Sequence, residues 1–279
     1  MTPAPPLPST VLSGATQPRS AANAVRDLRD GFALYELWLF LGWRDVRKVY
    51  SRSTLGPFWL TLSMGVMIGT LGILYSQIFK TDIHTYLPFL AISFVTWNLI
   101  SGSITGACMV FADAAVAIRQ MRMPLSLYLL KFVWTQLIAF FHNFVIYILV
   151  ALIFTVPLGL SALLALPALA LIAINAFFAA MILGVISARF RDVPMMVASV
   201  VQITFFLTPI IWHADQLSGR SYLVELNPFY HLIEIIRAPL LGQASDGQSW
   251  AIVLALTLVH GGIAFAFFAR FRSRIAYWA

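Results

Sequence analysis

The chain has 279 residues, of which 60% are hydrophobic and only 10% are charged. Soluble domains carry about a quarter charged residues, so this composition excludes an ordinary soluble enzyme, a disordered chain and a nucleic-acid-binding module. The formal net charge is +7, but the basic residues lie between apolar blocks, and we interpret them as signals of membrane topology. The single cysteine, Cys108, excludes an internal disulfide.

Residues 1–22 are predicted to be a disordered, proline-rich tail, because five prolines fall within the first twenty residues. No apolar run follows a basic start, so we do not expect a signal peptide.

Residues 23–52 are predicted to form an amphipathic helix. Apolar side chains recur every three or four positions and so share one helical face, and the basic residues lie largely off this face. Gly31 and Gly42 are the expected break points. An aromatic, basic helix of this kind is typical of the inner headgroup layer. It is either an anchor or also the rim of a pathway, where arginines would meet a phosphate bidentately. The apolar face consists of Val25, Leu28, Phe32, Tyr35, Leu39, Trp43, Val46 and Tyr50.

Residues 53–279 predict a domain of six transmembrane helices, since a bilayer core requires about 20 apolar residues in a helix. The turn Pro157-Leu158-Gly159 divides one long uncharged stretch into two spans. Residues 125–130 are expected to extend the third span, with Lys131 snorkelling toward the interface. The uncharged stretches are 53–79, 85–112, 132–188, 193–214 and 247–269.

The distribution of basic residues predicts that both termini are cytoplasmic. With the N-terminus inside, the inner segments carry 15 of the 18 Lys and Arg residues, and the outer segments carry Lys80, Arg220 and Arg237. This bias follows the positive-inside rule. Five or seven spans would put the basic C-terminus on the wrong side.

The loop 113–124 is predicted to contain a short cytoplasmic helix, because Asp113 suits an N-cap and Pro124 suits the position just after a helix ends. It carries Arg119 and Arg122. Two roles remain open, a solvated connector or a helix that docks in a groove of a partner.

The outer segment 215–246 is predicted to contain an apolar helix, with Asn227 as its N-cap and Pro228 at its first position. Glu234 and Arg237 are spaced to pair, and Pro239 is expected to end the helix. Because its side chains are apolar, the helix must dip into the membrane body or pack as a lid.

Several motifs that enzymes and metal sites use are absent from the sequence. None of its three lysines follows a glycine, so it has no phosphate-binding loop and is not expected to hydrolyse ATP alone. The histidine spacing fits no metal site, and no Asp or Glu lies inside a span. His142 and His260 are the intramembrane titratable residues, and we expect them to be hydrogen-bonded packing residues. We therefore predict no catalytic residue, metal or cofactor in this chain.

Five blocks of sequence, in order, resemble ABC-type permeases that export polysaccharides, with the closest likeness in the O-antigen and teichoic-acid branch. The resemblance runs from about residue 25 to the C-terminus. The blocks are RDVRKVYSRSTLGPFW (44–59), IRQMRMPLSLYLL (118–130), ARFRDVP (188–194), FFLTPIIW (205–212) and LNPFYHLIEIIRAPLLG (226–242).

The resemblance implies an all-α integral membrane protein of the bacterial cytoplasmic membrane that forms a homodimer and binds two ATPase subunits, which hold Mg-ATP. It implies a lipid-linked glycan as substrate. By this resemblance, the segment 32–50 is expected to be a cytoplasmic gate helix and the segment 114–123 a coupling helix on the ATPase. The segment 229–237 is expected to belong to outer gate helices that re-enter the membrane.

The same resemblance assigns candidate roles to groups of residues. We expect Asp113, Arg119, Gln120, Met121 and Arg122 to couple to the ATPase. We expect Arg44, Arg47, Tyr50 and Arg52 at a cytoplasmic gate that receives a pyrophosphate. The expected channel lining is Trp59, Tyr75, Phe205 and Phe206, and the expected outer gate is Asn227, Pro228, Tyr230, His231, Glu234 and Arg237.

Two other functions remain open at this stage. One is a drug or small-lipid exporter of the same architecture. The other is a membrane-embedded lipid-modifying enzyme, for which His231 and Glu234, three residues apart, are the candidate catalytic pair.

Overall fold

The computed structural model describes residues 21–50, 58–216, 221–244 and 246–278, and these contain helices and turns but no strand. The predicted all-α class is therefore confirmed for the described part of the chain. The predicted tail lies outside the described residues, except for residues 21 and 22, which begin the first helix.

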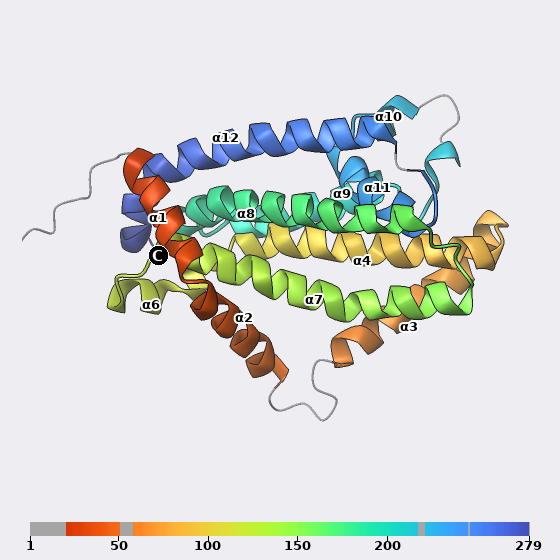
Figure 1. Cartoon of the computed structure of the whole chain (residues 1–279), viewed down its shortest axis with the longest axis horizontal. Coiled ribbons are helices and arrows are strands. Elements are labelled where there is room, and N and C mark those ends of the chain that lie inside the picture. Colours follow the sequence, from red (N-terminus) through yellow and green to blue (C-terminus); the bar gives the residue numbers. More distant parts are fainter. Residues whose placement is uncertain (1–20, 51–57, 217–220, 245, 279) are drawn as a thin grey trace, which may run out of the picture.

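The helices follow one another along the described parts of the chain (Figure 1). They are α1 (Ala21–Ala33), α2 (Tyr35–Tyr50), α3 (Phe58–Phe79), α4 (Ile83–Ala107), α5 (Val110–Asp113), α6 (Ala115–Gln120), α7 (Leu125–Ile153), η2 (Leu160–Leu164), α8 (Ala165–Arg189), α9 (Val193–Leu207), η3 (Ala214–Gln216), α10 (Ser221–Glu225), α11 (Pro228–Leu240) and α12 (Gly247–Trp278).

Five of the described helical segments are long and apolar enough to cross a membrane: α3, α4, α7, η2 with α8, and α12. The predicted fifth span, 193–214, is helical only as far as Leu207, and α9 has 15 residues. That length rises about 22 Å, short of the roughly 30 Å of a bilayer core. Thr208 is extended because it precedes Pro209, a position that disfavours the helical conformation.

The long helices α4, α7, α8 and α12 lie side by side (Figure 1), with α8 against α12 and α4 against α7. At one end lie α1, α6 and the C-terminal part of α12; we call this the α6 end. The opposite end, which we call the α10 end, carries α10 and the turn between α3 and α4. The helix α11 packs on α4, α8 and α12.

Two apolar cores lie within this bundle. One includes Ile92, Tyr147 and Ile233 and joins α4, α7 and α11. The other includes Leu129 and Phe268 and joins α7 to α12 near the α6 end. Many large apolar side chains remain exposed on the outside, which is typical of helices that face lipid.

The N-terminal amphipathic segment forms two helices, and the break falls at Leu34, not at Gly31 or Gly42 as predicted. Gly31 is buried against α7, where an added Cβ would lie 2.1 Å from Ser126 Oγ. Its small size therefore allows close packing of the two helices. On the predicted apolar face, Val25, Phe32, Tyr35 and Trp43 are exposed, whereas Leu28, Leu39 and Val46 are half-buried.

The short helix in the loop 113–124 is present, but Asp113 is not its N-cap. Asp113 ends α5 and its amide donates to Met109 O, so its backbone is already helical. The helix α6 begins after Ala114, with no side-chain cap, and ends at Gln120. Pro124 instead occupies the N-cap position of α7.

Lys131, which was expected to snorkel toward the interface, pairs with an acidic residue of α2. It lies in the first third of α7, and its Nζ is 2.7 Å from Asp45 Oδ2 on α2. The pairing fixes α2 against α7 because both helices lie side by side there.

Candidate functional site

The surface around α6 consists of exposed polar and apolar side chains. All five predicted coupling residues, Asp113, Arg119, Gln120, Met121 and Arg122, are exposed. Val116 is also exposed, so α6 presents apolar as well as charged groups at the α6 end. A short exposed helix with both kinds of side chain has the composition of a docking element.

A buried carboxylate holds the start of α7, directly after α6. Asp27 is 5% exposed, and its Oδ1 accepts the Ser126 amide at 2.9 Å while Oδ2 accepts the Leu125 amide at 3.2 Å. The first amides of a helix have no partner within the helix, and Pro124 has no side-chain acceptor to offer them. Asp27 therefore caps α7 from a distance of about a hundred residues in sequence.

The same carboxylate joins a third helix. Arg272 of α12 donates from Nη2 to Asp27 Oδ2 at 2.7 Å, and the Ser126 hydroxyl donates to Asp27 O at 2.6 Å. We call Asp27, Leu125, Ser126 and Arg272 the Asp27 cluster. It links α1, α7 and α12 at the point where the loop carrying α6 enters the bundle.

The predicted gate arginines lie on α2. Arg44 and Arg47 are exposed, whereas Asp45 between them faces α7 and pairs with Lys131. Tyr50 is the last residue of α2, and Arg52 lies outside the described residues.

The predicted channel residues do not share one surface within the chain. Trp59 and Phe206 are more than half exposed. Tyr75 stacks on Phe79 at 5.5 Å, and Phe205 packs in the core with its ring 5.8 Å from that of Trp97. The single chain therefore shows no continuous aromatic path through these four residues.

At the α10 end, α11 begins as predicted. The Asn227 side chain accepts the Phe229 amide at 3.0 Å and donates to Thr208 Oγ1 at 2.9 Å, so it caps α11 and ties it to the end of α9. The helix ends at Leu240, and Gly242 follows with φ +71°, where an added Cβ would lie 2.2 Å from Pro157 O.

The predicted Glu234–Arg237 pair is present. Arg237 is 5% exposed; its Nε and Nη2 both donate to Glu234 Oε2, and Nη1 donates to Pro209 O at 2.7 Å. Its guanidinium carbon lies 4.6 Å from the Phe89 ring centre. These hydrogen bonds and the ion pair offset the cost of removing the Arg237 charge from water.

A cavity of about 630 Å³ opens beside this pair. It lies between the start of α4, the segment 154–157, the segment 213–214 and α11. From α11 it receives Tyr230, Glu234 and Arg237, which share one helical face, and Leu241 joins them from the position directly after the helix. We call it the outer cavity. Burial, and next the nearby Glu234 carboxylate, raise the pKa of the Tyr230 phenol, so its hydroxyl stays protonated.

The candidate catalytic pair of a lipid-modifying enzyme is not assembled. His231 is 2% exposed, and its ring nitrogens lie 3.0 Å from Ser249 Oγ and 2.7 Å from Glu225 O. Glu234 faces Arg237 and the outer cavity instead. His231 is buried and joins α11 to α12 and to the end of α10, while its place in an outer gate stays a prediction.

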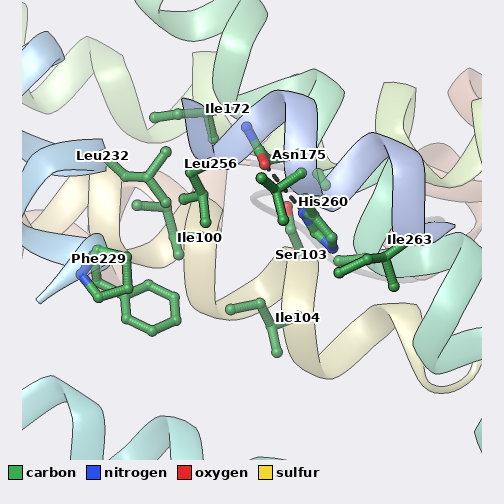
Figure 2. A pocket seen from close by; sticks show the side chains of 14 residues that line it. Ile100, Ser103, Ile104, Ile172, Asn175, Phe229, Leu232, Leu256, His260 and Ile263 are labelled. Carbon is green, nitrogen blue, oxygen red and sulfur yellow. Dashed lines mark hydrogen bonds between the residues drawn. The ribbon is translucent and has the colours of Figure 1, made fainter. Parts of the chain in front are cut away.

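A second cavity, of about 300 Å³, opens between α4, α8, α11 and α12 (Figure 2). Its lining is apolar apart from Ser103, Asn175 and His260. Asn175 pairs with His260 (Oδ1 to Nδ1, 3.1 Å) and donates to Thr257 Oγ1 behind the lining (2.7 Å). His260 is thus a hydrogen-bonded packing residue, as expected. His142 likewise contacts Ile138 O at 2.8 Å. Within the described residues, no three metal-ligating side chains come together.

The chain matches the ABC-2 type transporter family over residues 36–241, which is most of its length. It therefore belongs to this family, whose members are membrane subunits of transporters, and it is a multi-pass membrane protein.

Among characterised relatives, it is similar to the O-antigen export system permease protein RfbA of Myxococcus xanthus, with 24% identity over 221 residues, 77% of this chain and 84% of that protein. It is also similar to a protein of the same name from Klebsiella pneumoniae, with 21% identity over 202 residues, 72% of this chain and 78% of that protein. The resemblance to polysaccharide-export permeases is thereby confirmed.

The Asp27 cluster was not predicted. The segment 23–52 carries four acidic residues, and nothing in the local pattern distinguishes Asp27 from Asp30, Glu36 and Asp45. The missing cap at Pro124 was the available clue, because a helix that starts after proline with Leu-Ser lacks its own acceptor.

Proposed function

We propose that this chain is the transmembrane subunit of an ATP-driven exporter of a lipid-linked polysaccharide, of O-antigen, teichoic-acid or capsule type. Two copies form the permease, and two ATPase subunits that bind Mg-ATP drive it from the cytoplasm. Both termini are cytoplasmic, and α9 with the extended residues after it makes the sixth crossing of the cytoplasmic membrane.

The observation that carries this proposal is the exposed helix α6, fastened to the bundle by the Asp27 cluster. The sequence holds no phosphate-binding loop, so the energy must come from another subunit. A partner that pushes on α6 would act through the start of α7, and Asp27 passes that displacement to α1 and α12. The family match and the relatives' names support the polysaccharide class.

The exposed side chains support the roles proposed for the other groups of residues. Arg44 and Arg47 on α2 are free to meet a pyrophosphate at the inner surface, with Arg52 next in sequence. The helix α9 has no buried residue, so we expect it to pack against the second copy of the chain. Trp59 and Phe206, both exposed, would line a path formed between the two copies, whereas Tyr75 and Phe205 support it from behind. The helices α10 and α11 re-enter the membrane body as the outer gate.

The test uses the complete transporter. Deleting the gene should cause lipid-linked glycan to accumulate on the cytoplasmic side, and membranes with this chain alone should show no ATP turnover. The double variant Arg119→Glu/Arg122→Glu should lose ATPase association, while Arg29→Glu/Arg270→Glu, also exposed at the α6 end, should retain it. Unchanged association in the first variant would remove the docking role. Normal export without this chain would overturn the function.

A further inference from the structure

The outer cavity contains polar atoms that make no hydrogen bond to the described protein. Among the described residues, no hydrogen bond reaches the Tyr230 hydroxyl, the Gln243 amide group, the His84 ring nitrogens or Glu234 Oε1. All four side chains line the same space, from α4, α11 and the turn after α11. Together they offer donors and acceptors that a hydroxylated ligand can satisfy.

Aromatic rings form much of the remaining wall. Phe154 and His84 meet edge to face at 5.2 Å on one side, and Phe89 stacks under His213 at 4.0 Å on the other. Tyr230 presents a half-buried ring beside them. Flat apolar faces next to free hydrogen-bonding groups suit a ligand with both C–H faces and hydroxyls.

The charge in the cavity is balanced. Arg237 and Glu234 pair with each other, and Arg237 donates its other bonds to Pro209 O and Ser93 Oγ. An anion such as a phosphate would have to displace Glu234 from the guanidinium. A neutral ligand needs no such displacement, because Glu234 Oε1 remains available to accept from a hydroxyl.

We propose that the outer cavity is a saccharide-binding subsite that holds one or two neutral sugar units. This deepens the proposed function, on which it rests, by assigning the exported glycan a contact at the α10 end. The volume of about 630 Å³ lies within the range of small-molecule sites. A weak site there would hold the emerging chain and oppose its return, while the few neutral hydrogen bonds permit release.

The test is saturation-transfer NMR on the whole transporter in lipid nanodiscs, with maltose, lactose and chitobiose as probes and glycerol 3-phosphate as a mimic of a lipid headgroup. We expect millimolar binding of at least one sugar. The variant Tyr230→Phe/Gln243→Ala should weaken it about five-fold, since it removes two neutral hydrogen-bonding groups without removing a ring. The matched variant Tyr277→Phe/Gln248→Ala changes exposed residues outside the cavity and should bind as the wild type does.

Three results would overturn the subsite: no transfer to any sugar, equal transfer in the cavity variant, or displacement of sugar by glycerol 3-phosphate. The export assay separates this from the proposed function. Export without sugar binding would reject the subsite and leave the exporter standing. Sugar binding that depends on Tyr230 and Gln243, in a strain whose export does not need this chain, would reject the exporter and support the subsite.

Discussion

Asp27 and Asp45 make ion pairs of the same length, 2.7 Å, yet their surroundings differ. The Asp27 side chain is 2% exposed and also accepts two backbone amides, whereas the Asp45 and Lys131 side chains are 36% and 24% exposed. Solvent screens the second pair but not the first, so burial rather than distance decides what each carboxylate contributes.

We therefore predict that Asp27→Asn lowers the free energy of unfolding by about 3 kcal/mol, because an amide nitrogen would face a backbone N–H and the Arg272 guanidinium. Asp45→Asn should cost less than about 1 kcal/mol and matter less at high salt. Asp30→Asn, exposed on the same helix as Asp27, serves as control. Thermal unfolding of the detergent-solubilised protein measures all three. Equal losses at Asp27 and Asp45 would contradict the argument.

Glycine substitutions should give opposite signs at two positions. Gly31→Ala places a Cβ 2.1 Å from Ser126 Oγ and must push α1 away from α7, so it should destabilise the protein. Gly262→Ala on α12 meets nothing within 4 Å and should stabilise it by up to about 1 kcal/mol through helix propensity. The same unfolding measurement tests both. A neutral Gly31→Ala would mean that α1 is not packed as described.

At the scale of elements, local signals predicted the start of α11, and in the loop 113–124 they predicted the short helix but not how it begins. The Asn227-Pro228 start of α11 is a cap formed by neighbouring residues, so sequence spacing contains it. The start of α7 is capped by Asp27, a residue on another helix. Asp113, the predicted N-cap of the short helix, is instead the last residue of α5. Side chains that act across helices leave no periodic pattern, which is why Asp27 and the Lys131–Asp45 pair escaped prediction.

Asn227 has two separable roles, and its variants should distinguish them. Asn227→Ala removes the cap of α11 and the bond to Thr208, and should cost about 1–2 kcal/mol. Asn227→Asp keeps the acceptor for the Phe229 amide but loses the donor to Thr208, so it should recover most of that stability. If export stays impaired in Asn227→Asp while stability returns, the link between α9 and α11 serves the transport cycle. An Asp variant as unstable as the Ala variant would show that capping is not the main contribution.

For the whole molecule, apolar length located most of the spans, because a helix in lipid must satisfy its own backbone. Five of the six predicted spans contain a long described helix at the expected place, and the long uncharged stretch divides at the predicted turn. The exception is the fifth span, where α9 ends early at Thr208 and Pro209. The outer cavity could not be predicted, because it gathers residues from four segments far apart in sequence.

The orientation of the bundle rests on charge alone, and one labelling experiment tests it. The natural thiol of Cys108 is 1% exposed, so a Cys108→Ala background gives a clean starting point. Met121→Cys lies at the α6 end and Gln243→Cys at the α10 end, and both positions are exposed. Since 15 of 18 basic residues fall on the α6 side of the predicted topology, a membrane-impermeant maleimide should label Gln243→Cys in intact spheroplasts. Met121→Cys should react only after the membrane is opened. The reverse pattern would turn α6 away from any cytoplasmic ATPase, and the proposed coupling would then have no physical route.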